Sequence, residues 1–310
     1  MATSPWALAA SPIVVGGQQG WQHDPGFRGG SFHTFDAFRP EGTQAPAHKV
    51  HVFLPRGYAQ SNARYPVVYV NDGDTTFFPD GALRKNWRLH EALERLAERG
   101  PDSRLIAVAI VPVNRNEEYT HAPVAGRSGC CGLEAYATFI TGPVKTFIDT
   151  HYRTRPDVQN TFTLGASHGG LAAFFTAARY PDRVGGAVAM SSSFWVGLDS
   201  LLGGGLPFPS SLRGSTLVRM LDTSLRRAEV LPRMYLDWGL VRTGGPHNSI
   251  IEALATARGR EMASLLREDY GFDADTLKTV EDAAGAHDED SWARRVEAAF
   301  AFLLSRRALP

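Results

Sequence analysis

The sequence predicts an α/β protein with a mainly parallel central sheet flanked by helices and with an N-terminal β extension. Short runs of β-branched and aromatic residues alternate with longer segments of helical period, the pattern of successive β-α-β units. Several of these runs are continuously apolar, as in strands that are covered on both faces. No linker divides the chain, so we expect one domain over residues 1–310, of which 1–45, rich in Gly, Pro and Gln, form an irregular extension.

The expected strands follow from residue type and alternation. Lys49–Leu54 alternates polar and apolar residues, which predicts a half-exposed strand that ends at Pro55–Tyr58. Three runs, at 66–70, 105–111 and 161–164, are apolar enough to be buried strands. Further strands are expected at 184–190, 233–238 and 277–281.

The expected helices show an apolar period near 3.6 residues. They cover 87–96, 133–152, 171–180, 250–270 and 291–304. The stretch 191–231 contains Gly203–Gly205 and several prolines, so we expect it to be loosely organised.

Composition excludes several classes of function. With 32 basic and 32 acidic residues the formal net charge is zero, which argues against a nucleic-acid partner, because phosphate binding needs a surplus of Lys and Arg. The sequence has no run of about 18 apolar residues, so no membrane span is expected. The first ten residues lack a basic segment and a long apolar segment, so no signal peptide is expected either.

The two cysteines, Cys130 and Cys131, are adjacent and lie between glycines. Neighbouring cysteines are poorly placed for an unstrained disulfide, so we expect two ordinary thiols. That usage fits a reducing, cytoplasmic location. Neither Cys/His spacing nor the dispersed acids indicates a metal site, and we expect no metal and no organic cofactor.

The strongest chemical motif is Gly165-Ala-Ser-His-Gly169. It follows the expected strand 161–164 and opens a helix, which is the context of a nucleophile elbow. The small residues let strand and helix approach closely, and Ser167 then lies exposed at the turn. Ser167 is therefore the expected nucleophile.

A nucleophilic serine needs a base and an acid, which in this architecture follow it in the order acid, then histidine. His287 lies between the last expected strand and the last helix, where the base belongs. The loop after the strand 233–238 has no carboxylate. Glu252, at the start of the next helix, is favoured as the acid, and Asp237, inside the strand, is the alternative.

The oxyanion hole needs two backbone N–H donors. One is expected from His168, which follows the nucleophile. The other is expected from Asp74, because Gly73 permits the unusual backbone that such a loop requires. Arg115 and Tyr119 follow another strand at the same edge of the sheet, so they are candidate substrate contacts. A structural ion-pair loop explains them equally well.

With these motifs the sequence resembles those of the putative-esterase branch of the α/β-hydrolase superfamily. That branch includes esterase D, enterochelin-esterase-like proteins, feruloyl esterases and the antigen 85 mycolyltransferases. The resemblance runs from about Val50 to Leu304. It implies the α/β-hydrolase fold. In the mycolyltransferases the acid is a glutamate shortly after an Asn, and Asn248-Ser-Ile-Ile-Glu252 is similar to that segment. The segments that carry the resemblance are 65–73, 115–119, 165–170 and His287 followed by Trp292.

The expected function is hydrolysis of a small-molecule carboxylic ester by a serine esterase with a Ser-His-acid triad. Acyl transfer to an alcohol through the same intermediate is one alternative. A non-catalytic binding protein on the same fold is another, favoured only by the missing carboxylate after Trp238.

Overall fold

Within residues 8–81, 84–199 and 211–305, which this computed structural model describes, ten strands form one sheet. The strands are β1 (Leu8–Val15), β2 (Gln18–Asp24), β3 (Gly30–Phe38), β4 (His48–Pro55), β5 (Val67–Val70), β6 (Ile106–Val111), β7 (Thr161–Ala166), β8 (Gly186–Met190), β9 (Arg233–Gly239) and β10 (Leu277–Asp282). The helices are α1 (Gly73–Thr76), α2 (Leu89–Glu98), α3 (Arg115–Tyr119), α4 (Leu133–Phe139), α5 (Lys145–His151), α6 (His168–Arg179), α8 (Thr216–Arg227), α9 (Ala253–Tyr270) and α10 (Glu289–Leu304).

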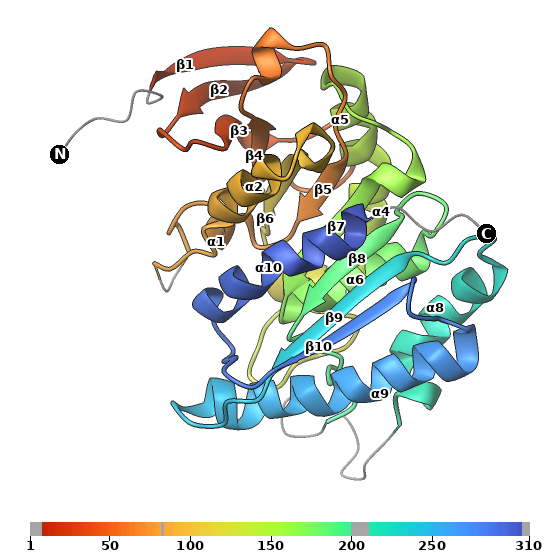
Figure 1. Cartoon of the computed structure of the whole chain (residues 1–310). Helices are drawn as coiled ribbons and strands as arrows, with labels where there is room; N and C mark the ends of the chain where they lie inside the picture. Colours follow the sequence, from red (N-terminus) through yellow and green to blue (C-terminus); the bar gives the residue numbers. More distant parts are fainter. Residues whose placement is uncertain (1–7, 82–83, 200–210, 306–310) are drawn as a thin grey trace.

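The sheet has the strand order β1-β2-β3-β4-β6-β5-β7-β8-β9-β10 (Figure 1). β1 to β4 pair antiparallel, and β4 also pairs antiparallel with β6. From β6 to β10 all neighbours are parallel. The expected fold, a mainly parallel sheet with an N-terminal β extension, is confirmed. The seven strands expected from Lys49 onwards are present as β4 to β10.

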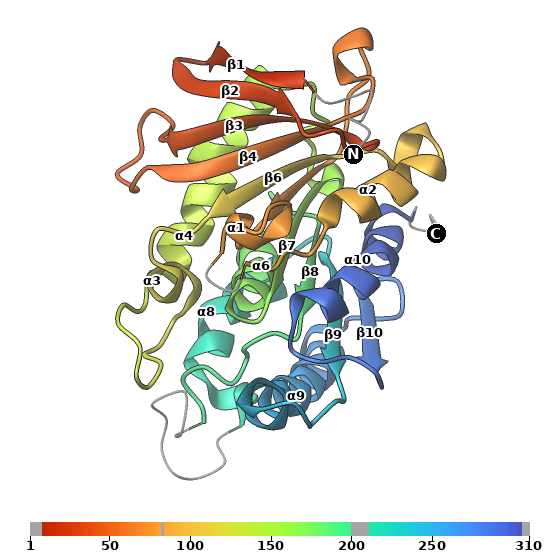
Figure 2. The same cartoon turned by 90° about the vertical axis from the view of Figure 1, so that its left-hand side faces the viewer.

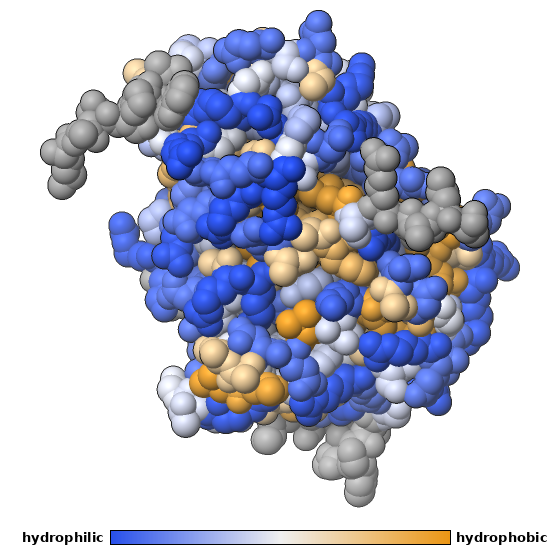
Figure 3. All heavy atoms as spheres, viewed as in Figure 1, coloured by the Kyte–Doolittle hydropathy of each residue, from blue (hydrophilic) through white to orange (hydrophobic). Residues whose placement is uncertain are grey.

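Helices cover both faces of the sheet (Figures 1 and 2). α2 and α10 contribute apolar side chains to the core on one face. α4, α5, α6, α8 and α9 contribute to the core on the other. Strands buried on both faces need apolar residues at every position, which explains the uninterrupted apolar runs in β5, β6 and β8. The outer surface seen in Figure 3 is mostly hydrophilic, with hydrophobic residues in small areas.

The N-terminal segment is more regular than expected. The expectation of irregular structure is wrong for residues 8–38, most of which form β1, β2 and β3. Val15 pairs with Gln18, so Gly16 and Gly17 are a two-residue hairpin turn. Their φ angles are 50° and 77°, and a Gly-Gly pair supplies such angles readily, so these glycines join two strands where we expected irregular chain.

β4 is buried rather than half exposed. The expected alternation came from Lys49 and His51, but His51 is only 3% exposed. Its Nδ1 atom lies 2.8 Å from Thr34 Oγ1 on β3. A polar residue can thus occupy a covered strand when a neighbouring strand supplies its hydrogen-bond partner, which the local pattern does not reveal.

The helices differ from expectation in three places. The helix expected over 133–152 contains a π-helical segment, Ile140–Val144, around Pro143, because proline has no N–H to continue the normal ladder. The helix expected from residue 250 starts earlier, with the π-helical segment His247–Glu252. The loosely organised stretch 191–231 contains the 12-residue helix α8; residues 200–210 lie outside the described part.

The cysteine expectation is wrong, because Cys130 and Cys131 form a disulfide. Cys131 has a positive φ of 80°, an unusual backbone for a residue with a side chain. A reducing location was expected from free thiols, and that argument loses its basis. In the described ranges, no helix is long and apolar enough to cross a membrane.

Candidate active site

Ser167 lies at the sharp turn between β7 and α6, at the carboxyl end of the parallel strands. Its backbone has φ 56° and ψ −122°, a conformation that a residue with a side chain keeps only where its surroundings hold it. A Cβ atom on Gly165 would lie 2.1 Å from the carbonyl oxygen of Gly169. Strand and helix therefore meet at this turn only because Gly165 lacks a side chain, as a nucleophile elbow requires.

His287 lies in the loop between β10 and α10, where its side chain contacts Glu252. The ring nitrogen Nδ1 is 2.5 Å from Glu252 Oε2. The backbone N–H of His287 donates to Asn248 Oδ1 at 2.9 Å, which fixes the loop. Glu252 ends the π-helical segment and is fully buried. When Nδ1 donates its proton to Glu252, the other ring nitrogen, Nε2, is the basic one.

Asp237, the alternative acid, has a different partner. It lies in β9, 1% exposed, and both of its carboxylate oxygens accept hydrogen bonds from Arg295. The donors are Nε and Nη2, each at 3.0 Å. In the described part of the chain, Asp237 has no hydrogen bond to His287. The structure thus brings Glu252, and not Asp237, to the imidazole.

Ser167 and His287 line the same cavity, of about 770 Å³. Ser167 Oγ lies 3.4 Å from Ser193 Oγ, and Ser193 Oγ lies 2.9 Å from His168 Nδ1. Between these described residues, no hydrogen bond joins Ser167 Oγ to His287. Such a contact in a hydrolase often tightens only when substrate binds. Three tryptophans, Trp87, Trp195 and Trp292, also line the cavity.

The two N–H groups expected in the oxyanion hole belong to the first turns of helices. His168 is the first residue of α6 and Asp74 the second of α1, and both line the cavity. The first N–H groups of a helix have no acceptor within it. Among the described residues, neither N–H donates to another residue's backbone. The N–H of His168 is therefore available to an oxygen in the cavity, whereas the N–H of Asp74 also contacts the carboxyl group of Asp74 itself.

Arg115 reaches the cavity, but Tyr119 does not. Arg115 Nε and Nη2 donate to Asp72 Oδ1 and Oδ2 at 2.7 and 2.9 Å. The backbone N–H of Asp72 donates to the hydroxyl of Tyr119 at 3.0 Å, and Tyr119 is fully buried. The two residues thus hold Asp72, which has φ 56° and precedes the turn that carries the Asp74 N–H. The segment expected as a loop is the short helix α3.

The charges at the site follow from burial and from these contacts. Burial alone would raise the pKa of Glu252, but the hydrogen bond and charge of His287, with donors from Gly239 and Ser191, lower it below its ordinary value. Glu252 is therefore ionised at neutral pH. Burial and the charge of Arg115 lower the pKa of His168 well below its usual range, so the His168 imidazole is neutral.

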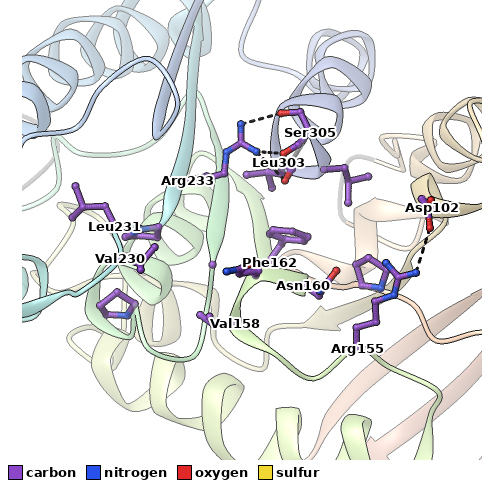
Figure 4. Close-up of a pocket in the computed structure, with 16 residues that line it drawn as sticks. Asp102, Arg155, Val158, Asn160, Phe162, Val230, Leu231, Arg233, Leu303 and Ser305 are labelled. Atoms are coloured by element: carbon purple, nitrogen blue, oxygen red, sulfur yellow. Dashed lines mark hydrogen bonds and ion pairs between the residues drawn. The ribbon is translucent and has the colours of Figure 1, made fainter. Parts of the chain in front are cut away.

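A second cavity, of about 400 Å³, lies at the amino ends of the strands (Figure 4). In Figure 4, Arg155 points toward Asp102 and Arg233 toward Ser305. Arg155 Nη2 lies 3.4 Å from Asp102 Oδ1, and Arg233 Nη2 donates to Ser305 Oγ at 3.0 Å. None of the expected catalytic residues lines it. Across the described ranges, no group of three or more His, Cys, Asp or Glu side chains could hold a metal ion.

Three residues near the site were not expected from the sequence: Ser191, Ser193 and Arg295. Ser191 and Ser193 follow β8 directly, at the same sheet edge as Ser167. Polar residues just after a buried parallel strand often reach a ligand site, and that position could have drawn attention to them. Arg295 lies within the last helix, where only the fold reveals its partner Asp237.

Comparison with known proteins gives a family and a fold. The family described as Putative esterase matches residues 45–303. The curated Bacillus subtilis (strain 168) protein named "Uncharacterized protein YbbA" is 31% identical over 150 residues, which are 46% of this chain and 56% of that protein. The chain therefore spans little more than half the length of this curated relative.

Two solved structures show the shared fold. An IroE-like serine hydrolase from Shewanella oneidensis matches with a TM-score of 0.60 at 18% identity, over 88% of this chain and 79% of that one. The siderophore hydrolase EstA from Aspergillus nidulans matches with a TM-score of 0.62 at 18% identity, over 86% of this chain and 93% of that one. The arrangement of strands and helices is that of the α/β-hydrolase fold.

Proposed function

Because the chain belongs to the putative-esterase family and is therefore a carboxylic ester hydrolase, we propose that it cleaves a small-molecule ester through an acyl-enzyme on Ser167. His287 is the general base and Glu252 the acid that orients it. The observation that carries the proposal is the 2.5 Å contact between His287 Nδ1 and Glu252 Oε2, beside the cavity that both Ser167 and His287 line.

The proposed reaction uses groups of this chain and water. Ser167 Oγ attacks the acyl carbon while its proton passes to Nε2 of His287. The backbone N–H groups of His168 and Asp74 stabilise the oxyanion of the tetrahedral intermediate. His287 then gives the proton to the leaving alcohol, and the acyl group stays on Ser167. A water molecule, deprotonated by His287, attacks this ester. The bond from the acyl carbon to Ser167 Oγ then breaks, His287 returns the proton to Oγ, and the carboxylic acid is released.

Glu252 contributes by its charge and its position. The imidazole becomes cationic during attack, and an ionised carboxylate at hydrogen-bond distance stabilises that cation. The lowered pKa of Glu252 supports this role, because the group stays ionised at neutral pH. The one feature that favoured a non-catalytic protein was the missing carboxylate after Trp238. Glu252, from the helical segment His247–Glu252 that follows, supplies a carboxylate to His287, so the missing carboxylate no longer argues against catalysis.

Labelling with a fluorophosphonate probe tests the proposal, because such probes react with an activated serine. We expect the wild-type protein to be labelled on Ser167, as located by peptide mass spectrometry. Ser167→Ala should abolish labelling and lower ester hydrolysis by about 10³-fold or more, with an unchanged melting curve. Full activity in a folded Ser167→Ala protein would overturn the proposal.

The substrate class is tested with a panel of p-nitrophenyl, feruloyl and thioester substrates. A siderophore ester belongs in the panel, because the name of one matched structure is that of a siderophore hydrolase. Product analysis with and without added alcohol distinguishes hydrolysis from acyl transfer: a new ester in place of the free acid would favour a transferase.

A further inference from the structure

A buried chain of hydrogen bonds lies behind Glu252, on the side away from His287. Ser191 Oγ donates to Glu252 Oε1 at 2.9 Å. The same hydroxyl accepts from Arg295 Nη2 and from Trp292 Nε1, each at 3.3 Å. Ser191 is fully buried, so water does not replace these contacts. The hydroxyl of Ser191 thus joins a buried cation to a buried carboxylate.

Arg295 is held in place from several directions. It is 6% exposed and donates to both oxygens of Asp237 on β9. Its Nη1 also donates to Asp282 Oδ2, at the end of β10, at 3.1 Å. A buried arginine is stable only with such partners. Its guanidinium has therefore a fixed position, from which Nη2 reaches Ser191.

The backbone of Ser191 is unusual. Its φ is 43°, in the region that favours glycine, and a residue with a side chain there costs free energy. The N–H of Ser191 donates to the carbonyl oxygen of Asp237 at 2.8 Å. A serine at a position that favours glycine indicates that its hydroxyl has a use.

We propose that Ser191 is a positioning residue for the triad acid: with Arg295 behind it, Ser191 holds one carboxylate oxygen of Glu252 so that the other faces His287. The inference rests on the proposed function, because it assumes that Glu252 orients the base. Oε1 accepts from Ser191 Oγ and from the N–H of Gly239. Oε2 is thereby left to His287 Nδ1.

The charges around Glu252 fit this role. Four structural elements face it: the segment after β8 with Ser191, the end of β9 with Gly239, the β10–α10 loop with His287, and α10 with Arg295 through Ser191. Arg295 donates to the carboxylates of Asp237 and Asp282, so it orients Ser191 without itself binding Glu252. Among these contacts, the Ser191 hydroxyl is the one that connects Arg295 to Glu252.

Two substitutions test the proposal, with a matched control in the next residue. Ser191→Gly suits the backbone at φ 43° and removes the hydroxyl, and Ser191→Ala keeps the Cβ atom. The control is Ser192→Ala, because Ser192 is also buried and its Oγ has no hydrogen-bond partner in the part of the chain that the structure describes. Ester hydrolysis and thermal melting are measured for all three.

We expect both Ser191 variants to lower kcat by about tenfold to a hundredfold, because a hydrogen bond to a charged group is lost. KM should change by less than about twofold, since Ser191 is buried away from substrate. Ser192→Ala should match the wild type. In a Glu252→Gln background, Ser191→Ala should change kcat by less than about twofold, because the acid it positions is already disabled.

Separate outcomes overturn the inference and the proposed function. If Glu252→Gln cripples kcat while folded Ser191→Ala and Ser191→Gly keep it, the triad stands and the positioning role is wrong. If the Ser191 variants lower kcat equally with and without Glu252, Ser191 acts by another route and the inference is also wrong. If Glu252→Gln leaves kcat unchanged, the proposed triad fails, and this inference with it.

Discussion

Replacing Glu252 by glutamine is the most informative single perturbation of the proposed triad. The amide keeps the shape of the side chain but has one acceptor oxygen instead of two. In the native site Oε1 accepts from Ser191 Oγ and the Gly239 N–H, and Oε2 accepts from His287 Nδ1 at 2.5 Å. The glutamine oxygen will stay with the two donors at Oε1, since a turned amide would face both of them with its own N–H.

The amide NH₂ then faces His287 Nδ1, which must become an acceptor. In that tautomer the proton is on Nε2, so the imidazole cannot accept the proton of Ser167. The negative charge that stabilises the imidazolium is lost as well. An Asp-to-Asn change in the triad of a serine protease lowers kcat by about 10⁴-fold for the same reason. We therefore expect a loss of about 10²–10⁴-fold, or roughly 3–5 kcal/mol of activation free energy.

The assay is steady-state hydrolysis of a p-nitrophenyl ester at neutral pH, together with a thermal melt. KM should stay nearly constant, because Glu252 is fully buried and touches no substrate. The melting temperature should change little, since the amide fills the same space. A Glu252→Gln enzyme that keeps more than about a tenth of the wild-type kcat would refute the reasoning, and the triad would reduce to a Ser–His pair.

Three further outcomes are expected. Asp237→Asn weakens the buried pair with Arg295, so the free energy of unfolding measured with denaturant should fall by about 2–4 kcal/mol. Asp282 still holds Arg295 behind Ser191, so kcat per folded molecule should fall by less than about tenfold; a loss of about 10²-fold or more in a stable protein would make Asp237 the acid. Arg115→Lys replaces a two-point contact with Asp72 by a single one, so kcat/KM should fall by about tenfold, and an unchanged value would show that this contact does not hold the oxyanion turn. Burial, with the charge of Lys49, lowers the pKa of His51 to about 3, below the unfolded value of about 6.5. Between these values the unfolded chain binds the extra proton, so stability falls as pH drops, by about 2 kcal/mol at pH 5 for this group. Unfolding of the wild type and of His51→Gln at pH 7.5 and pH 5 checks the difference, and equal losses would contradict it.

Much of the fold was predictable because its signals are local. Strands and helices repeat every few residues, so the side chains that face the core recur at a fixed spacing. The apolar runs of β5 to β9 and the helical periods show this spacing within short stretches of sequence. The turn that carries Ser167 is equally local, because Gly165 is required by the approach of one strand to the helix that follows it. The N-terminal hairpin was missed although it has a local signal, because Gly16-Gly17 was interpreted as irregular chain instead of as a two-residue turn.

The choice between the two candidate acids depends on the tertiary structure. His287 and Glu252 are 35 positions apart in the sequence. Asp237 is a second carboxylate, near the carboxyl end of β9. Sequence spacing does not record which of the two points at the imidazole. The parallel strands and α10 place Arg295 beside Asp237, and Arg295 donates to both oxygens of that carboxylate. Glu252 is then the carboxylate that contacts His287.

By itself, the sequence determined the α/β architecture, the position of Ser167 at the strand–helix turn and the loop that carries His287, since each depends on residues close together in the chain. Only the tertiary structure decided that Glu252 contacts His287, that Tyr119 supports Asp72 from within the core, and that Ser191 joins Arg295 to Glu252. These contacts join separate strands and helices, and a buried polar atom takes whichever partner the packing places within about 3 Å of it.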